Sequence, residues 1–236
     1  MGFLDKFMGG NTLYYPGCLT KFALRDVMEN YEKIFGKLRI DFIKLKELEA
    51  CCGLPVITAG YEEDARTLAE KNYKLFKERG VARIVCNCPA CYRMFTHEYP
   101  KLIKWDIPAE HAMQTIWSAM KKGAKFHPLN LKVTYHDPCK LRMEGVFDEP
   151  REILRALGCE IKEMRLARSK SFCCGGGGGM RANFPALTKA VAKERAKHAL
   201  DTRADVLVTP CPMCYVVLKE ALEGEMEVKE LSMLLV

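Results

Sequence analysis

The sequence predicts an α/β protein made of two pseudo-symmetric repeats, each a small, mostly parallel sheet with flanking helices. Two observations lead to this prediction. Five cysteine positions recur in the same order in both halves of the chain, and each half alternates short apolar runs with longer amphipathic segments. Such alternation favours a parallel sheet covered by helices. The chain has 236 residues, of which 49% are apolar, so it can bury substantial cores.

The repeat is defined by two sets of five cysteines. The first set is Cys18, Cys51, Cys52, Cys88 and Cys91, and the second set is Cys139, Cys173, Cys174, Cys211 and Cys214. Offsets of 121, 122 and 123 residues relate the sets, and Cys-Pro-Ala-Cys-Tyr at 88–92 returns as Cys-Pro-Met-Cys-Tyr at 211–215. A repeat of this extent indicates a duplicated fold. We therefore predict domains at 11–125 and 130–236, preceded by an N-terminal arm at 1–10.

Hydrophobic periodicity places the individual elements. Helix 62–79 is the clearest, because its apolar residues recur at steps of three and four. The first half is predicted to contain strands 12–15, 41–45 and 83–86 and helices 22–35 and 62–79. The second half is predicted to contain strands 132–135, 160–164 and 205–208 and helices 150–157, 184–200 and 215–222. An apolar stripe from Ala109 to Met120 at helical spacing predicts a further core segment.

Four of the ten cysteines follow a predicted strand and precede a helix, namely Cys18, Cys88, Cys139 and Cys211. In open α/β sheets, ligands bind at this edge. Pro89 and Pro212 fall in the first helical turn, where a missing amide proton costs nothing. The free amides of that turn can then face a bound group.

The number of cysteines favours a polynuclear iron-sulfur centre in each repeat. Four thiolates suffice for zinc or for a cubane cluster. The fifth cysteine, and the adjacency of Cys51 with Cys52 and of Cys173 with Cys174, exceed either need. A zinc-stapled structural protein remains the alternative. Cys86 and Cys159 have no counterpart in the other half and are interpreted as small buried residues outside the sites.

Composition excludes several other classes. The N-terminus has no secretory signal, so we expect reduced thiols and a cytoplasmic location. The net charge is +7, but basic residues are interspersed with acids, which argues against a nucleic-acid surface. No apolar run reaches the roughly 18 residues of a transmembrane segment.

The spacing of each set resembles the CCG cysteine-rich domain. A cysteine is followed by Cys-Cys-Gly after 32 or 33 residues and by Cys-x-x-Cys after about 35 more. This domain occurs in duplicate in the B subunit of heterodisulfide reductase and in the C-terminal part of the D subunit. The segment Phe-Cys-Cys-Gly-Gly-Gly-Gly-Gly-Met-Arg at 172–181 is especially similar to the second copy in the D subunit.

The resemblance implies that each set of five cysteines binds a noncubane [4Fe-4S] cluster and that a small disulfide or thiol substrate reacts between the clusters. The chain lacks a Cys-x-x-Cys-x-x-Cys-x-x-x-Cys ferredoxin run. Electrons are therefore expected from a partner, either a flavoprotein or an iron-sulfur subunit of the ferredoxin-like kind. The resemblance also extends to electron-transfer subunits of lactate, glycolate and related dehydrogenase complexes, which is the second functional hypothesis.

Some further residues are weaker candidates. The glycine run 175–179 does not fit a dinucleotide fingerprint, because Met180 stands where glycine or alanine is required. We expect the run to leave room for substrate at the second set, which would then be the more open centre. His136 is a candidate proton donor, Arg142 and Arg181 are candidate contacts for an anionic group, and the apolar arm 1–8 is a candidate docking segment.

Overall fold

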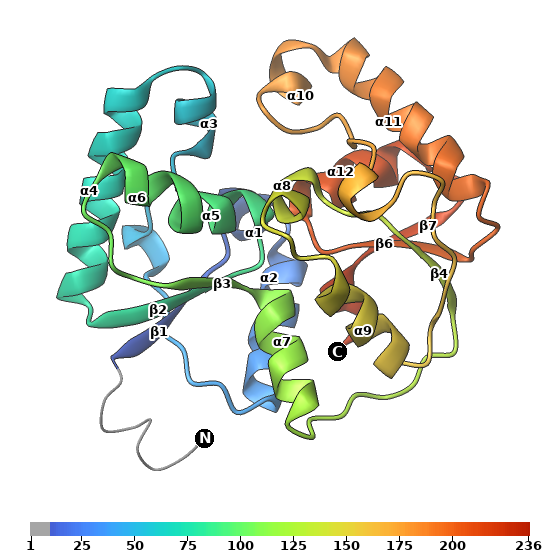
Figure 1. Cartoon of the computed structure of the whole chain (residues 1–236), viewed down its shortest axis with the longest axis horizontal. Coiled ribbons are helices and arrows are strands. Elements are labelled where there is room, and N and C mark those ends of the chain that lie inside the picture. The colour runs from blue at the N-terminus through green and yellow to red at the C-terminus, as the bar shows by residue number, and fades with distance from the viewer. Residues whose placement is uncertain (1–9) are drawn as a thin grey trace.

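The computed structural model describes residues 10–236 and shows the two repeats side by side, the first in blue to green and the second in yellow to red (Figure 1). Each repeat contains one parallel sheet with helices on both faces. The predicted α/β fold class is confirmed. The expected docking segment 1–8 lies outside the described residues.

Both sheets are entirely parallel. The first has the order β1-β2-β3, with β1 at Asn11–Tyr15, β2 at Val81–Cys86 and β3 at Ala109–His111. The second has the order β5-β4-β6-β7, with β4 at Lys132–Tyr135, β5 at Glu160–Ile161, β6 at Val206–Thr209 and β7 at Glu227–Glu230. Ile43 forms a parallel bridge with Leu13 of β1, where β5 lies beside β4 in the second repeat. The two repeats therefore share one strand order.

The helices follow the same repeat. In the first repeat they are α1 (Cys18–Ala23), α2 (Arg25–Lys37), α3 (Leu54–Thr58), α4 (Glu62–Glu78), α5 (Pro89–Arg93), α6 (Tyr99–Leu102) and α7 (Ala112–Lys121). In the second they are α8 (Cys139–Met143), α9 (Asp148–Ala156), α10 (Met180–Asn183), α11 (Pro185–Leu200) and α12 (Pro212–Ala221). Short 3₁₀ helices span Lys46–Leu48, Arg168–Lys170 and Leu231–Leu234, and a π-helical turn spans Met94–Glu98. Within residues 10–236, no helix combines the length and the apolar character needed to cross a bilayer.

Most of the predicted elements are present, and the errors concern short strands. The predicted strand 41–45 is reduced to the single bridge at Ile43, and β5 has only two residues. Strands β3 and β7 were not predicted, and Ala109 belongs to β3 rather than to the following helix. Both strands contain glutamate, which is uncommon in strands, and both are held by pairing with a buried neighbour.

The repeats share a central core. Side chains alternate along a strand, so Tyr14 of β1 faces inward while Leu13 and Tyr15 belong to an outer core of the first repeat. In the central core, Tyr14 and the buried faces of α2 and α7 pack with Tyr135, α9 and the C-terminal 3₁₀ helix. α7 and α9 lie against each other at this boundary (Figure 1). Packing therefore fixes the position of one repeat relative to the other.

One buried hydrogen bond crosses the boundary between the repeats. The Tyr31 hydroxyl donates to the Glu230 carboxylate over 2.7 Å, and both side chains are fully buried. The backbone amide and the hydroxyl of Ser232 also donate to this carboxylate. Burial nevertheless raises the pKa of Glu230 to about 7, because the remaining surroundings cannot solvate its charge.

Replacing Glu230 by glutamine should flatten the pH dependence of stability. The folded state keeps the Glu230 proton up to a pKa of about 7, whereas the unfolded chain releases it near 4.5. The wild type should therefore lose unfolding free energy relative to Glu230→Gln as pH rises from 4.5 to 7, by about 3 kcal/mol. Urea unfolding at pH 5 and pH 8 measures the difference. Exposed Glu227→Gln is the control, and parallel pH profiles for wild type and Glu230→Gln would contradict the assignment.

Candidate functional site

All ten motif cysteines lie beyond the carboxyl ends of strands or in the loops beside them. Cys18 and Cys139 begin α1 and α8, directly after β1 and β4. Cys88 and Cys211 precede the first residues of α5 and α12, and Pro89 and Pro212 begin these helices as predicted. The paired cysteines come from the loops before α3 and α10. Two strand ends and one loop thus supply the thiols in each repeat.

The structure brings each set of five thiols together. Successive thiols are in hydrogen-bonding contact, in the order Cys18, Cys51, Cys52, Cys91, Cys88 in the first set. The order in the second set is Cys139, Cys173, Cys174, Cys214, Cys211. The same chain of contacts forms twice. Cys86 and Cys159 are elsewhere, the former donating to the Glu110 carbonyl over 3.6 Å and the latter in the central core.

The thiols of each set lie close enough to shift one another's pKa. The hydrogen bond from Cys18, followed by that from Cys52, lowers the pKa of Cys51 to about 2. Its neighbour Cys18 has a raised pKa, because its proton is held by that hydrogen bond and by burial. Cys173 and Cys139 repeat the pattern. Thiols this close cannot all ionise without compensating positive charge, so the donor set fits a multivalent metal centre that displaces the protons.

A glycine after each cysteine pair shapes the loop. The Gly53 amide donates to Cys51 Sγ over 3.4 Å, and the Gly175 amide donates to Cys173 Sγ over 3.3 Å. Both glycines have φ values in the left-handed region, +89° and +83°. Side-chain-bearing residues rarely adopt this conformation, which explains why Cys-Cys is followed by glycine in both repeats.

Gly17 permits the close approach of the first set. Its φ is +77°, and a Cβ placed on it would lie 2.8 Å from Cys91 Sγ. Any side chain here would displace that sulfur. The equivalent residue of the second repeat is Pro138, so the two sets are enclosed differently.

A cavity of about 500 Å³ lies against the first set. All five of its thiols line the cavity, together with the glycines at 176–179 and Arg181 from the second repeat. The glycine run therefore borders a cavity as expected, but the thiols there belong to the first set and not to the second. Gly175 packs against Val191, and Gly176 packs against Met213 and Val217. These contacts direct the rest of the glycine run towards the first repeat, where it lines the cavity.

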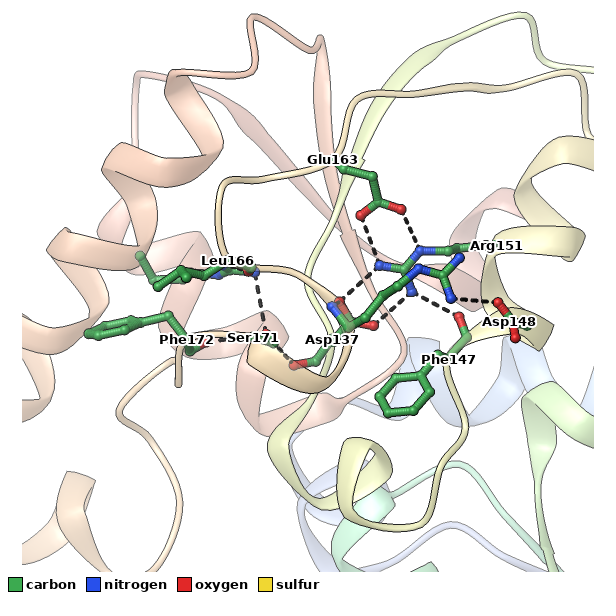
Figure 2. A network of polar contacts seen from close by, with 10 residues as sticks. Asp137, Phe147, Asp148, Arg151, Glu163, Leu166, Ser171 and Phe172 are labelled. Carbon is green, nitrogen blue, oxygen red and sulfur yellow. Dashed lines mark hydrogen bonds and ion pairs between the residues drawn. The ribbon is translucent and has the colours of Figure 1, made fainter.

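A buried ion-pair network supports the loops of the second set (Figure 2). Arg151 is fully buried and makes two bonds to Asp137, of 2.7 and 2.9 Å, and two to Glu163, of 2.5 and 2.9 Å. Its remaining donor reaches the Phe147 carbonyl over 2.8 Å. All five donors of the guanidinium are satisfied, which is the condition for burying this charge.

The network joins two cysteine-bearing segments. Asp137 is two residues before Cys139, and Ser171 is two residues before Cys173. The Ser171 hydroxyl donates to the Asp137 carbonyl over 3.0 Å, a contact visible in Figure 2. Arg142 donates to the Ser171 carbonyl over 2.8 Å, so this candidate anion contact is already used in holding the loop.

His136 does not have the properties expected of a proton donor. It is fully buried, and its Nδ1 accepts a 3.0 Å hydrogen bond from Nε of Arg195. Burial, and then the charge of Arg195, lowers the pKa of His136 to about 3, whereas a general acid at neutral pH needs a pKa near 7. Arg195 was missed by the sequence analysis. Its signal was an arginine in line with the buried alanines of helix 184–200, which are Ala192, Ala196 and Ala199.

The fold and the thiol sets define a duplicated, cysteine-rich α/β protein. Comparison with known families agrees: the family described as "CCG: Cysteine-rich domain" matches residues 12–96 and again 133–219. The chain belongs to the CCG cysteine-rich domain family, with two copies of the domain.

The relatives include components of redox complexes. The D subunit of dihydromethanophenazine:CoB--CoM heterodisulfide reductase from Methanosarcina acetivorans is 34% identical over 95% of this chain and 58% of its own length. The B subunit of fumarate reductase (CoM/CoB) from Methanothermobacter marburgensis is 30% identical over 92% of this chain and 43% of its length. EtfAB:quinone oxidoreductase of Syntrophomonas wolfei is 31% identical over 90% of this chain and 31% of its length. The chain thus spans between about a third and three fifths of these relatives.

Replacing Arg151 by methionine should destabilise the fold by about 3–5 kcal/mol, because Asp137 would remain buried and unpaired. Urea unfolding measures the loss, and mass spectrometry after brief alkylation should show faster labelling of Cys139 and Cys173. Arg168→Ala is the control, since it breaks only the exposed pair with Asp148. A change in stability as small as that of the control would refute a supporting role for the network.

Proposed function

We propose that this chain is an iron-sulfur oxidoreductase subunit of the heterodisulfide-reductase type. Each set of five cysteines binds one noncubane [4Fe-4S] cluster, and a disulfide-type substrate is reduced in the cavity beside the first set. The proposal is supported by the convergence of ten thiols in two identical arrangements and by the redox complexes to which the relatives belong.

The observation that carries the proposal is the composition of the cavity. Five thiols from one repeat face a glycine run from the other across about 500 Å³, room for a small disulfide. Gly177 leaves open space, since a Cβ there would meet no atom within 4 Å. Nη1 of Arg181, buried and without a hydrogen-bond partner among the described residues, is available to an anionic substituent of the substrate.

The redox balance requires a partner. Reduction of one disulfide to two thiols consumes two electrons and two protons, and the clusters, when bound, relay the electrons. A ferredoxin-like iron-sulfur subunit or a flavoprotein is the proposed donor, because the heterodisulfide reductase and fumarate reductase relatives are themselves named as subunits. Protons come from solvent through the open cavity. The cytoplasm is the proposed location, since it keeps such thiols reduced.

A second function is favoured by a specific comparison. The similarity to EtfAB:quinone oxidoreductase favours a role in electron transfer only. The sequence resemblance adds complexes that oxidise lactate, glycolate or related substrates as the setting for that role. Disulfide turnover by the isolated chain with an artificial electron donor distinguishes the two functions, because a pure electron carrier would show none.

Anaerobically purified chain should contain iron and acid-labile sulfide for two clusters, with paramagnetic signals that are not those of a cubane. Gly17→Ala should lose about half of the iron, because its Cβ displaces Cys91 Sγ from the first set. Gly60→Ala is the matched control: its φ is +92°, but a Cβ there meets no atom within 4 Å. It should lose only about 1–2 kcal/mol of stability and keep its iron. Stoichiometric zinc without sulfide would overturn the proposal in favour of a zinc-stapled protein.

Gly177→Val should abolish most disulfide turnover while leaving the iron content normal. The new side chain narrows the cavity that Gly177 lines, without backbone strain, because Gly177 does not adopt a left-handed φ. Gly36→Val is the matched control, since Gly36 is exposed on α2 with equally open surroundings. Normal iron content together with normal turnover in Gly177→Val would contradict the proposal that the disulfide is reduced in this cavity.

A further inference from the structure

The two thiol sets are backed by different polar side chains. Behind the second set lie His136, which follows β4, and Arg195 on α11. The equivalent residues of the first repeat are Tyr15, 121 positions before His136, and Asn72, 123 positions before Arg195. The second offset is supported by packing, since it also aligns the buried Ala65, Ala69 and Phe76 of α4 with buried residues of α11.

Arg195 is a buried charge without a carboxylate partner. Its side chain is fully buried, and its hydrogen bonds go to neutral acceptors: His136 Nδ1 at 3.0 Å, the Leu166 carbonyl at 2.7 Å and Ser171 Oγ at 3.4 Å. The nearby Asp137 carboxylate is bound to Arg151. A buried cation needs a compensating anion. The candidate anions are the thiolates of the second set, two of which lie beside His136.

The contact with Arg195 also fixes the tautomer of His136. A guanidinium N–H can only donate, so Nδ1 must offer its lone pair, and the proton of the neutral ring is on Nε2. A ring nitrogen of His136 lies within 4.8 Å of Cys174 Sγ and Cys214 Sγ, and Nε2 has no hydrogen-bond partner among the described residues. With Nδ1 bonded to Arg195, the Nε2 N–H is the free donor of a ring that lies beside these two sulfurs, and the ring has no free lone pair to bind a metal.

The first repeat offers no equivalent charge at the two matching positions. The Tyr15 hydroxyl donates to the Ala50 carbonyl over 2.5 Å, so its proton is already bonded to oxygen. Asn72 is fully buried and donates to the Cys51 carbonyl over 3.0 Å and to the Tyr99 hydroxyl over 2.8 Å. Both residues are neutral, and the described hydrogen bonds of both go to oxygen rather than to a thiol.

We propose that His136 and Arg195 make the second cluster the more oxidising of the two, through an N–H···S hydrogen bond and a fixed positive charge. Both effects stabilise the reduced, more negative state of a cluster and raise its reduction potential. His136 and Arg195 are thus positioning and tuning residues, and electrons entering this chain come to rest on the second cluster. The inference rests on the proposal that each set binds a cluster.

The test measures the two clusters separately. In a chain carrying Cys51→Ser and Cys52→Ser only the second cluster is loaded, and in one carrying Cys173→Ser and Cys174→Ser only the first. Potentiometric titration followed by electron paramagnetic resonance should give the second cluster a higher midpoint potential. We expect at least a tenfold difference in the one-electron equilibrium constant, about 59 mV.

Placing the first repeat's residues, tyrosine and asparagine, at the matching positions of the second repeat should remove the difference in midpoint potential. In the chain that loads only the second cluster, His136→Tyr with Arg195→Asn should lower the midpoint potential by at least the same tenfold factor. Arg195→Lys, which keeps the charge, should retain part of the effect. Equal potentials in the two parent chains, or a potential unchanged by this double substitution, would overturn the inference.

A measurement on the unmodified chain does not depend on the variants folding. With ¹⁵N-labelled histidine, electron-nuclear double resonance on the reduced second cluster should show a weak nitrogen coupling and a proton coupling that disappears in D₂O. A strong coupling from a directly bound nitrogen would overturn the N–H···S contact. Iron and sulfide counts on each sample separate the outcomes, since absent iron contradicts the proposed clusters themselves, whereas normal iron with equal potentials contradicts only the tuning.

Discussion

The contact among five sulfurs in each repeat is the constraint on which the rest of the structure depends. Such a group cannot carry five negative charges without a metal, and it cannot form unless separate loops meet at one edge of the sheet. Parallel strands meet this need, because their carboxyl ends all face one edge and direct cysteines from several segments towards it. The left-handed glycines after each cysteine pair, and Gly17 against Cys91, then let backbone and sulfur come closer than a side chain would permit.

The shared core holds two similar sites in a fixed relation, in which their surroundings differ. Because α7 packs on α9 and Tyr31 bonds to Glu230, the repeats hold a fixed relation, and the glycine run of the second can border the thiols of the first. The supporting contacts also differ. The second set is held by the buried ion pairs of Arg151, whereas the first depends on close packing around Gly17. Duplication thus supplied the thiols, and divergence outside the motifs gave each set its own surroundings.

Sequence patterns predicted the features that repeat and missed those that depend on tertiary contacts. Ten cysteines in register, helix 62–79 and strand 132–135 were all visible, because spacing and periodicity are local properties. Strands β3 and β7 were missed because pairing with a buried neighbour overrides the low strand propensity of their glutamates. The set lining the cavity was assigned incorrectly, since the path of the glycine run depends on its contacts with Val191, Met213 and Val217, which spacing alone does not reveal. Arg195 was not identified, because only its burial and its hydrogen bond to His136 reveal its position.

The positions of the cavity and of the buried charge suggest how a two-electron reaction can be divided. In the proposed function, substrate would meet the first set, whose backing by Tyr15 and Asn72 is neutral, while Arg195 and His136 lie beside the second. If the second cluster is the more oxidising one, as we propose, an electron on it would be stabilised away from the cavity until a second electron arrives. If the charge lay instead behind the cavity, the first electron would be held most tightly at the substrate, where one-electron reduction of a disulfide leaves a radical. The proposed difference in potential between the two repeats would therefore favour delivery of electrons in pairs.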